Sequence, residues 1–172
     1  MKGEPRFGHK GEDVVIYPWA RIVNAEHIEI GKGTRIDDFT FINGGKATKI
    51  GRYVHIASFT SIIGGGELEI GDYVSLACGA RIITGTHVPT GGKRMTASLP
   101  LEEQSVMRGK VVIGKDAFIG TNAVVHPDVT IGEGAVIGSN SLVLKDVEPW
   151  SVNVGSPCRK VGMREKVSIP DH

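Results

Sequence analysis

The sequence predicts an all-β protein, a parallel β-helix of hexapeptide repeats with one long inserted loop. Three observations support this. Aliphatic residues recur at every sixth position in groups of three, small or β-branched residues often stand four positions after them, and the rhythm stops once, after Ile82, and resumes at Ile113. The aliphatic positions are Ile16, Ile22, Ile28, Ile30, Ile36, Ile42, Ile50, Ile56, Ile62, Ile70, Leu76, Ile82, Ile113, Ile119, Val125, Ile131, Ile137 and Val143.

The six-residue period excludes an amphipathic α-helix. A step of six residues turns through roughly 600° on a helix, so successive positions would lie about 240° apart and could not form one buried stripe. On strands an even step returns the side chain to the same face. Three hexapeptides form one triangular coil, which explains the groups of three.

Glycine clusters fill the seams between coils. The aliphatic step widens to eight residues between Ile42 and Ile50 and again between Ile62 and Ile70, where Gly44-Gly45 and Gly64-Gly65-Gly66 stand. Glycine tolerates the positive φ that such corners need.

The repeat pattern divides the chain into parts. We expect residues 1–13 to form an N-terminal lead-in and residues 14–148 to form the β-helix, with the loop inserted at residues 84–110. Residues 149–172 then form a C-terminal extension.

Composition limits the classes of partner. The chain has 172 residues, within the range of one domain, and its 20 Lys and Arg against 19 Asp and Glu give no basic face for nucleic acid. No apolar run has the length of a membrane span, so we expect a cytoplasmic protein. Cys78 and Cys158 lack metal-site spacing and are interpreted as reduced thiols.

The inserted loop is the first candidate for function. Long loops inside compact repeats are uncommon unless they have a role, because ordering them costs backbone entropy. His87 stands at the start of this loop, directly after a regular coil that can hold an imidazole in place. The alternative is a tolerated surface insertion.

Three segments, Ile83–Pro89, Ile113–Gly120 and Gly155–Arg159, carry a resemblance to a known family. Their residues and order are similar to those of the galactoside, maltose and xenobiotic acetyltransferases, which are hexapeptide-repeat acyltransferases. The resemblance implies a left-handed β-helix, a homotrimer, acetyl-coenzyme A as donor and a loop histidine as general base, the position that His87 occupies. Crossover geometry alone favours a right-handed coil, so the handedness depends on the resemblance.

Three further segments, residues 37–40, 54–58 and 147–151, resemble acyltransferases of surface-polysaccharide and nucleotide-sugar biosynthesis. This resemblance implies a sugar or nucleotide-linked sugar as acceptor, and it leaves open whether a hydroxyl or an amine is acylated. We expect His55, Asp38 and Phe118 to contact the acceptor. His55 precedes an inward position, so alternation turns it outward, where simple solvation is the other interpretation.

The chemistry needs few groups. A thioester is already activated, so the enzyme must orient the acceptor, remove its proton and stabilise the oxyanion. Histidine is the side chain that titrates closest to neutral pH, so a single imidazole suffices and no metal is required.

Coenzyme A needs a groove and positive charge. Gly120-Thr121 and Gly138-Ser139 lie one coil apart in the repeat, where backbone groups could bind the amides of pantetheine. Lys145, Arg159 and Lys160, with Arg164 beyond them, are expected to bind the phosphates.

Two other classes remain open from the residues. A γ-type carbonic anhydrase on the same fold needs three histidines converging on zinc, and after His87 no histidine appears until His126. A non-catalytic β-helix that acts as an assembly subunit would not need His87 or the long loop. Catalysis by Cys78 is a weaker variant, because no histidine is adjacent to it in sequence.

Overall fold

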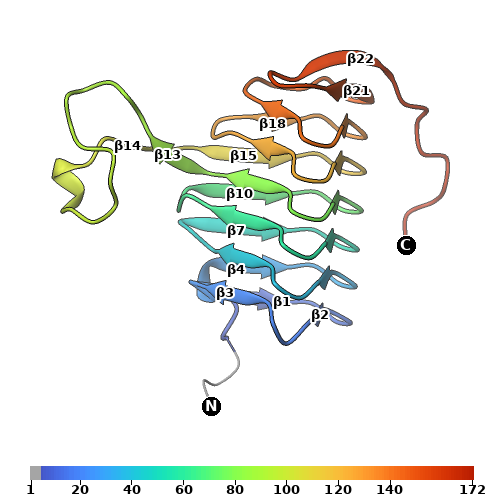
Figure 1. Ribbon diagram of the computed structural model, residues 1–172. Helices are drawn as coiled ribbons and strands as arrows, with labels where there is room; N and C mark the ends of the chain where they lie inside the picture. Colours follow the sequence, from blue (N-terminus) through green and yellow to red (C-terminus); the bar gives the residue numbers. More distant parts are fainter. Residues whose placement is uncertain (1–4) are drawn as a thin grey trace.

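Short parallel strands stack into three sheets that form the faces of a triangular prism (Figure 1). The computed structural model, which describes residues 5–172, is a left-handed β-helix and confirms the predicted fold class. The first sheet contains β1 (His9–Lys10), β4 (Ile28–Ile30), β7 (Ala47–Ile50), β10 (Glu67–Ile70), β15 (Lys110–Ile113) and β18 (Thr130–Ile131). The second contains β2 (Val15–Ile16), β5 (Arg35–Ile36), β8 (His55–Ile56), β11 (Ser75–Leu76), β16 (Phe118–Ile119), β19 (Val136–Ile137), β21 (Ser151–Val154) and β22 (Arg159–Met163). The third contains β3 (Arg21–Val23), β6 (Phe41–Asn43), β9 (Ser61–Ile63), β12 (Arg81–Ile83), β17 (Val124–Val125) and β20 (Leu142–Val143).

The predicted aliphatic positions form the core. In the second sheet Ile36 pairs with Ile56, Ile56 with Leu76 and Leu76 with Ile119, so identical faces of successive strands lie above one another. Their side chains are fully buried. Ile16 and Ile22 are the exceptions, because they belong to the first coil and pack against the core from one side only.

Many corner residues between the sheets have left-handed backbone, although the sequence predicted positive φ only at the glycine clusters between coils. Tyr53, Tyr73, Phe39, Phe59 and Trp150 all have a φ near +60°. Such conformations cost energy for bulky residues. Ring stacking compensates in part, since the centroids of Tyr53 and Tyr73 lie 5.5 Å apart and those of Phe39 and Phe59 5.4 Å apart.

Both ends of the prism differ from the expected boundaries. Strand β1 lies within the segment expected as a lead-in and pairs with β4, so the first sheet already begins at His9. At the other end, β22 turns back and pairs antiparallel with β21. The chain then descends alongside the stack as a segment that we call the strap, residues 164–172 (Figure 1).

The strap is held at its two ends. Arg164 donates from Nη1 to the backbone oxygen of Asp116 at 2.6 Å. Further along, the carboxylate of Asp171 accepts hydrogen bonds from Lys115 at 2.6 Å, and the backbone N–H of His172 donates to the hydroxyl of Tyr73 at 2.6 Å.

The inserted loop forms an arm, residues 85–109, that projects from the prism (Figure 1). Strands β13 (Gly85–His87) and β14 (Val106–Arg108) pair antiparallel at its base, and one turn of 3₁₀-helix, η2 (Leu101–Glu103), lies near its tip. A second such turn, η1 (Ala25–His27), occupies a corner of the first coil. Within residues 5–172 no helix has the length and apolar character needed to cross a membrane.

Candidate functional site

His87 ends strand β13 at the base of the arm, where the paired strands fix its backbone. In the antiparallel register it lies opposite Val106. Its side chain is half-buried, so the imidazole is both held and accessible.

The hydrogen bond of His87 defines its tautomer. Nδ1 lies 3.1 Å from the backbone oxygen of Ser105. A carbonyl oxygen only accepts hydrogen bonds, so Nδ1 carries the proton in this contact and neutral imidazole keeps its lone pair on Nε2. Within the described part of the chain Nε2 has no hydrogen-bond partner. The ring is therefore arranged to accept a proton.

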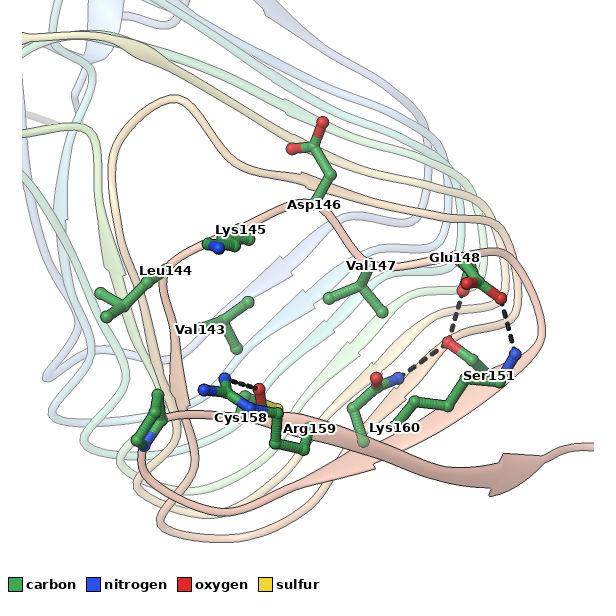
Figure 2. A pocket seen from close by; sticks show the side chains of 12 residues that line it. Val143, Leu144, Lys145, Asp146, Val147, Glu148, Ser151, Cys158, Arg159 and Lys160 are labelled. Atoms are coloured by element: carbon green, nitrogen blue, oxygen red, sulfur yellow. Dashed lines mark hydrogen bonds and ion pairs between the residues drawn. The ribbon is translucent and has the colours of Figure 1, made fainter.

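A cavity of about 560 Å³ lies at the C-terminal end of the prism (Figure 2). Its floor includes Val143 and Val147, which face the interior and have no further coil above them. Cys158 and the start of β22, with Arg159 and Lys160, line one side of this cavity (Figure 2). A second cavity of about 980 Å³ has the same origin at the opposite end, next to the first coil.

Three of the predicted phosphate-binding residues line the cavity at the C-terminal end. These are Lys145, Arg159 and Lys160, and all three are exposed. Lys160 forms an ion pair with Glu148 at 2.7 Å, so part of the positive charge is neutralised. Arg164 does not line this cavity, because its guanidinium is bonded to the corner backbone beneath the strap and stacks over the ring of Trp150.

Cys158 also lines this cavity. Burial raises the pKa of its thiol, an effect that hydrogen bonds from Ser141 and the Arg159 backbone offset in part. Cys158 and Cys78 are both free cysteines.

The two residue pairs expected to bind pantetheine, Gly120-Thr121 and Gly138-Ser139, lie one coil apart, as the repeat predicts. Ile119 pairs with Ile137, and the backbone N–H of Asn140 donates to the oxygen of Thr121 at 2.8 Å. Gly120 uses both of its backbone groups inside the coils, donating to Ile137 and accepting from Ala123. Gly138 donates its N–H to Asn153, and the Thr121 carbonyl accepts from Asn140, so each of these two residues has one backbone group engaged where Gly120 has two.

His55 belongs to a polar cluster on the outer face of the second sheet. Its Nε2 lies 2.9 Å from Oδ2 of Asp37, and Arg35 lies 3.0 Å from the other oxygen of that carboxylate. His55 was expected from the sequence as an acceptor contact, whereas Asp37 was not, although it begins the segment 37–40 that carries the second resemblance. Phe118 is 39% exposed two strands further along the same sheet. One carboxylate oxygen of Asp38, Oδ1, already accepts a hydrogen bond from the backbone N–H of Trp19 at 2.8 Å.

The arm and the cavity at the C-terminal end lie on the same part of the prism. The arm leaves after β12, and β20, which leads into the cavity, is two strands further along the third sheet. Neighbouring strands are about 4.8 Å apart, so these two levels differ by roughly 10 Å along the prism axis. Among residues 5–172, no three His, Cys, Asp or Glu side chains gather in a group that could hold a metal.

Comparison with known proteins agrees with this architecture. Residues 110–145 match the family described as bacterial transferase hexapeptide (six repeats). A protein of Escherichia coli named dTDP-4-amino-4,6-dideoxy-D-glucose acyltransferase is 37% identical over 164 residues, which cover 95% of this chain and 85% of the relative.

Solved structures give the same result. AntD, an N-acyltransferase from Bacillus cereus solved in complex with dTDP and 3-hydroxybutyryl-coenzyme A, has a TM-score of 0.87 at 33% identity, covering 92% of this chain and 84% of that one. A maltose O-acetyltransferase from Clostridium difficile has a TM-score of 0.61 at 28% identity, covering 93% and 71%. The chain belongs to the hexapeptide-repeat acyltransferases. Within that family it is more similar to the N-acyltransferase AntD than to this maltose O-acetyltransferase.

Proposed function

We propose that the protein transfers a short acyl group from an acyl-coenzyme A to the amino group of a nucleotide-linked amino sugar. The 37% identity to an acyltransferase of a dTDP-linked amino sugar supports the acceptor class. The likeness to AntD, solved with an acyl-coenzyme A and dTDP, supports the donor. Acetyl-coenzyme A is the first donor to test, and 3-hydroxybutyryl-coenzyme A is the second.

The observation that carries the mechanism is the hydrogen bond from His87 Nδ1 to the Ser105 carbonyl, because it leaves Nε2 as the base. The acceptor nitrogen attacks the thioester carbon, a C–N bond forms, and the carbonyl oxygen becomes an oxyanion. His87 Nε2 takes a proton from that nitrogen. The C–S bond then breaks, and the proton passes from the imidazolium to the departing thiolate of coenzyme A, which restores neutral His87.

The rim of the cavity at the C-terminal end is the proposed binding site for the coenzyme A phosphates. Arg159 and Lys160 supply charge there, and Lys145 stands on the same rim. An extended pantetheine is proposed to run along the corner past Thr121 and Ser139, which lies between the second and third sheets, at the opposite edge of the third sheet from the base of the arm. His55 and Phe118 on the second sheet are proposed acceptor contacts, with Asp38 at the adjoining corner.

We also propose that the active unit is a homotrimer. The first sheet is bordered by exposed ion pairs such as Lys46 with Glu67 and Lys110 with Glu69. The third sheet presents exposed apolar side chains, among them Phe41 and Ile63, beside the exposed Arg21 and Arg81. Burying this face and the arm against neighbouring subunits removes apolar surface from water. Light scattering after size-exclusion chromatography measures the mass, and a monomer at micromolar concentration contradicts this arrangement.

The function is tested by following free coenzyme A release with each donor and a panel of amino and hydroxyl sugars, free and dTDP-linked. His87→Ala is expected to lower kcat by roughly 100-fold, the usual scale of a lost general base, with little change in affinity for the donor. His27→Ala is the matched control, because His27 Nδ1 also contacts a backbone carbonyl, that of Gly45, at an exposed position that follows β3, three strands below β12 in the third sheet. Undiminished turnover of His87→Ala at saturation removes His87 from the mechanism.

The donor site has its own test. Changing Arg159 and Lys160 together to Ala is expected to raise KM for acetyl-coenzyme A far more than it lowers kcat, because phosphate binding is remote from the thioester. A short pantetheine thioester lacks the nucleotide phosphates and serves as control. If the double variant is equally impaired with both donors, these residues do not bind the phosphates.

A further inference from the structure

Ser105 is the one residue in the arm, residues 85–109, that is buried. It is 5% exposed, whereas the rest of the arm is half-buried or exposed. An arm with so little apolar packing must be held by its hydrogen bonds.

All polar groups of Ser105 are engaged within the arm. Its N–H donates to the backbone oxygen of Arg94 at 2.9 Å, and its own carbonyl accepts from the N–H of Val88 at 3.0 Å and from His87 Nδ1 at 3.1 Å. Its hydroxyl lies 2.6 Å from the oxygen of Val88 and 2.8 Å from that of Thr90. A hydroxyl has one hydrogen to donate, so the two carbonyls share it.

These contacts link the loop segment after His87 to the carbonyl that the imidazole uses. The hydroxyl draws residues 88–90 toward Ser105, and the Val88 contact keeps the Ser105 carbonyl beside the backbone of β13. Without the hydroxyl, two carbonyls of the turn lose their donor, and the Ser105 carbonyl is held beside Nδ1 only by the backbone N–H of Val88, so its position there is less fixed. Neutral imidazole then also populates the tautomer with the proton on Nε2, which cannot accept a proton there.

We infer that Ser105 is a positioning residue whose hydroxyl keeps its own carbonyl on His87 Nδ1 and thereby keeps Nε2 available as the base. The inference rests on the proposed function of His87. The hydroxyl does not touch the substrates in this scheme. It acts through the geometry of the turn.

The test uses the full-length protein labelled with ¹⁵N in its histidine rings. Nitrogen shifts identify which ring nitrogen carries the proton, and the His87 signals are assigned by their loss in His87→Ala. Wild type is expected to show the Nδ1–H form. Ser105→Ala is expected to shift the tautomer ratio toward Nε2–H by roughly two- to tenfold, the equilibrium effect of one hydrogen bond, and kcat is expected to fall in proportion to the measured loss of the Nδ1–H fraction. KM for the acyl-coenzyme A is expected to stay within about twofold.

Three variants complete the design. Ser105→Thr keeps the hydroxyl and is expected to restore both the tautomer and kcat. Ser98→Ala removes an exposed serine of the same arm and is expected to change neither. Ser105→Cys keeps the volume with a much weaker donor, and it replaces Ser105→Ala if that variant does not fold.

The two hypotheses fail in different ways. An unchanged Nδ1–H tautomer and kcat in Ser105→Ala or Ser105→Cys overturns the positioning role. If His87→Ala is fully active, the proposed base is wrong, while the nitrogen shifts still show whether Ser105 holds the ring. A tautomer shift without any loss of kcat overturns the link between the two.

Discussion

Gly33 shows at the residue scale how tightly the corners are built. Its φ is +68°, and a Cβ placed on it would lie 2.5 Å from the ring of Tyr53 in the next coil. Gly33→Ala is therefore expected to lower the free energy of unfolding by about 1–3 kcal/mol, from the left-handed backbone and the displaced ring together.

Gly162→Ala provides the control for Gly33→Ala. Gly162 has open space around its Cβ position and no positive φ. Urea unfolding of both variants gives the comparison. Equal stability of the two would show that the corner stacking around Tyr53 is not tight.

The two cysteines differ in reactivity for a physical reason. Burial raises the pKa of Cys158, so less of its thiol is the nucleophilic thiolate, and Cys78 is exposed. At mildly alkaline pH iodoacetamide is expected to modify Cys78 faster, by roughly an order of magnitude. Acetyl-coenzyme A at saturation, which has no free thiol to consume the reagent, is expected to slow labelling of Cys158 alone, as measured by peptide mass spectrometry. Equal slowing of both thiols would argue against a donor site at this cavity.

A residue of the site could be predicted from the sequence only where it stands at a break in the six-residue repeat or at a fixed position within it. His87 was found because the six-residue rhythm stops beside it. Ser105 was not found, because its importance depends on pairing across an arm whose register follows from β13 and β14 in three dimensions. The contact between Asp37 and His55 was not found for the same reason, since it connects neighbouring coils, although Asp37 lies in the segment 37–40 that carries the second resemblance.

At the scale of elements, a ladder of charges follows the corner between the first and second sheets. Asp72 accepts hydrogen bonds from the backbone and guanidinium of Arg52, at 2.6 Å and 2.7 Å. Burial alone would raise the pKa of Asp72, but these hydrogen bonds and the charge of Arg52 together lower it below its ordinary value.

The direction of this shift sets a pH dependence. Because the pKa is lower in the folded state, the pair stabilises the protein above the unfolded-state pKa of about 3.9, and this contribution is lost as the pH falls through the folded-state value. Asp72→Asn is expected to cost up to about 1 kcal/mol at neutral pH and progressively less at acid pH. Urea unfolding between neutral and acid pH measures this. Glu12→Gln, which breaks a looser exposed pair with Lys32 at 3.8 Å, is the control with no expected change.

At the scale of the whole molecule, the prism depends on strict alternation between inside and outside. Ile119 is fully buried, and its neighbour Phe118 in strand β16 is 39% exposed on the outer face. Ile119→Asp is expected to prevent folding, because an unpaired carboxylate inside the prism costs several kcal/mol of a total of about 5–15 kcal/mol. Phe118→Asp is expected to fold. Circular dichroism and thermal unfolding distinguish them, and a cooperative transition in Ile119→Asp contradicts the inward assignment.

The prism itself was predictable from sequence, because inward positions of a repeat are constrained by the same packing in every coil. The corners were less predictable. The left-handed backbone at Tyr53 and Phe59 accompanies the stacking of each ring on an aromatic ring of a neighbouring coil. The conformational preferences of tyrosine and phenylalanine alone do not indicate it. The strap was unpredictable for a stronger reason, since Lys115 and Asp171 meet across 56 positions without any repeat pattern.

The strap has a consequence for cooperativity. In a stack of coils each coil normally interacts only with its immediate neighbours, so such a structure behaves as a one-dimensional chain whose ends fray first. Residues 164–172 add a long-range coupling, because they join the end of β22 to the corner of the coil that contains Tyr73. Opening of the last coil must then release contacts three strands below β21 in the second sheet. Hydrogen exchange of the final coil is consequently tied to that of the middle of the prism, and the C-terminal end unfolds with its interior rather than ahead of it.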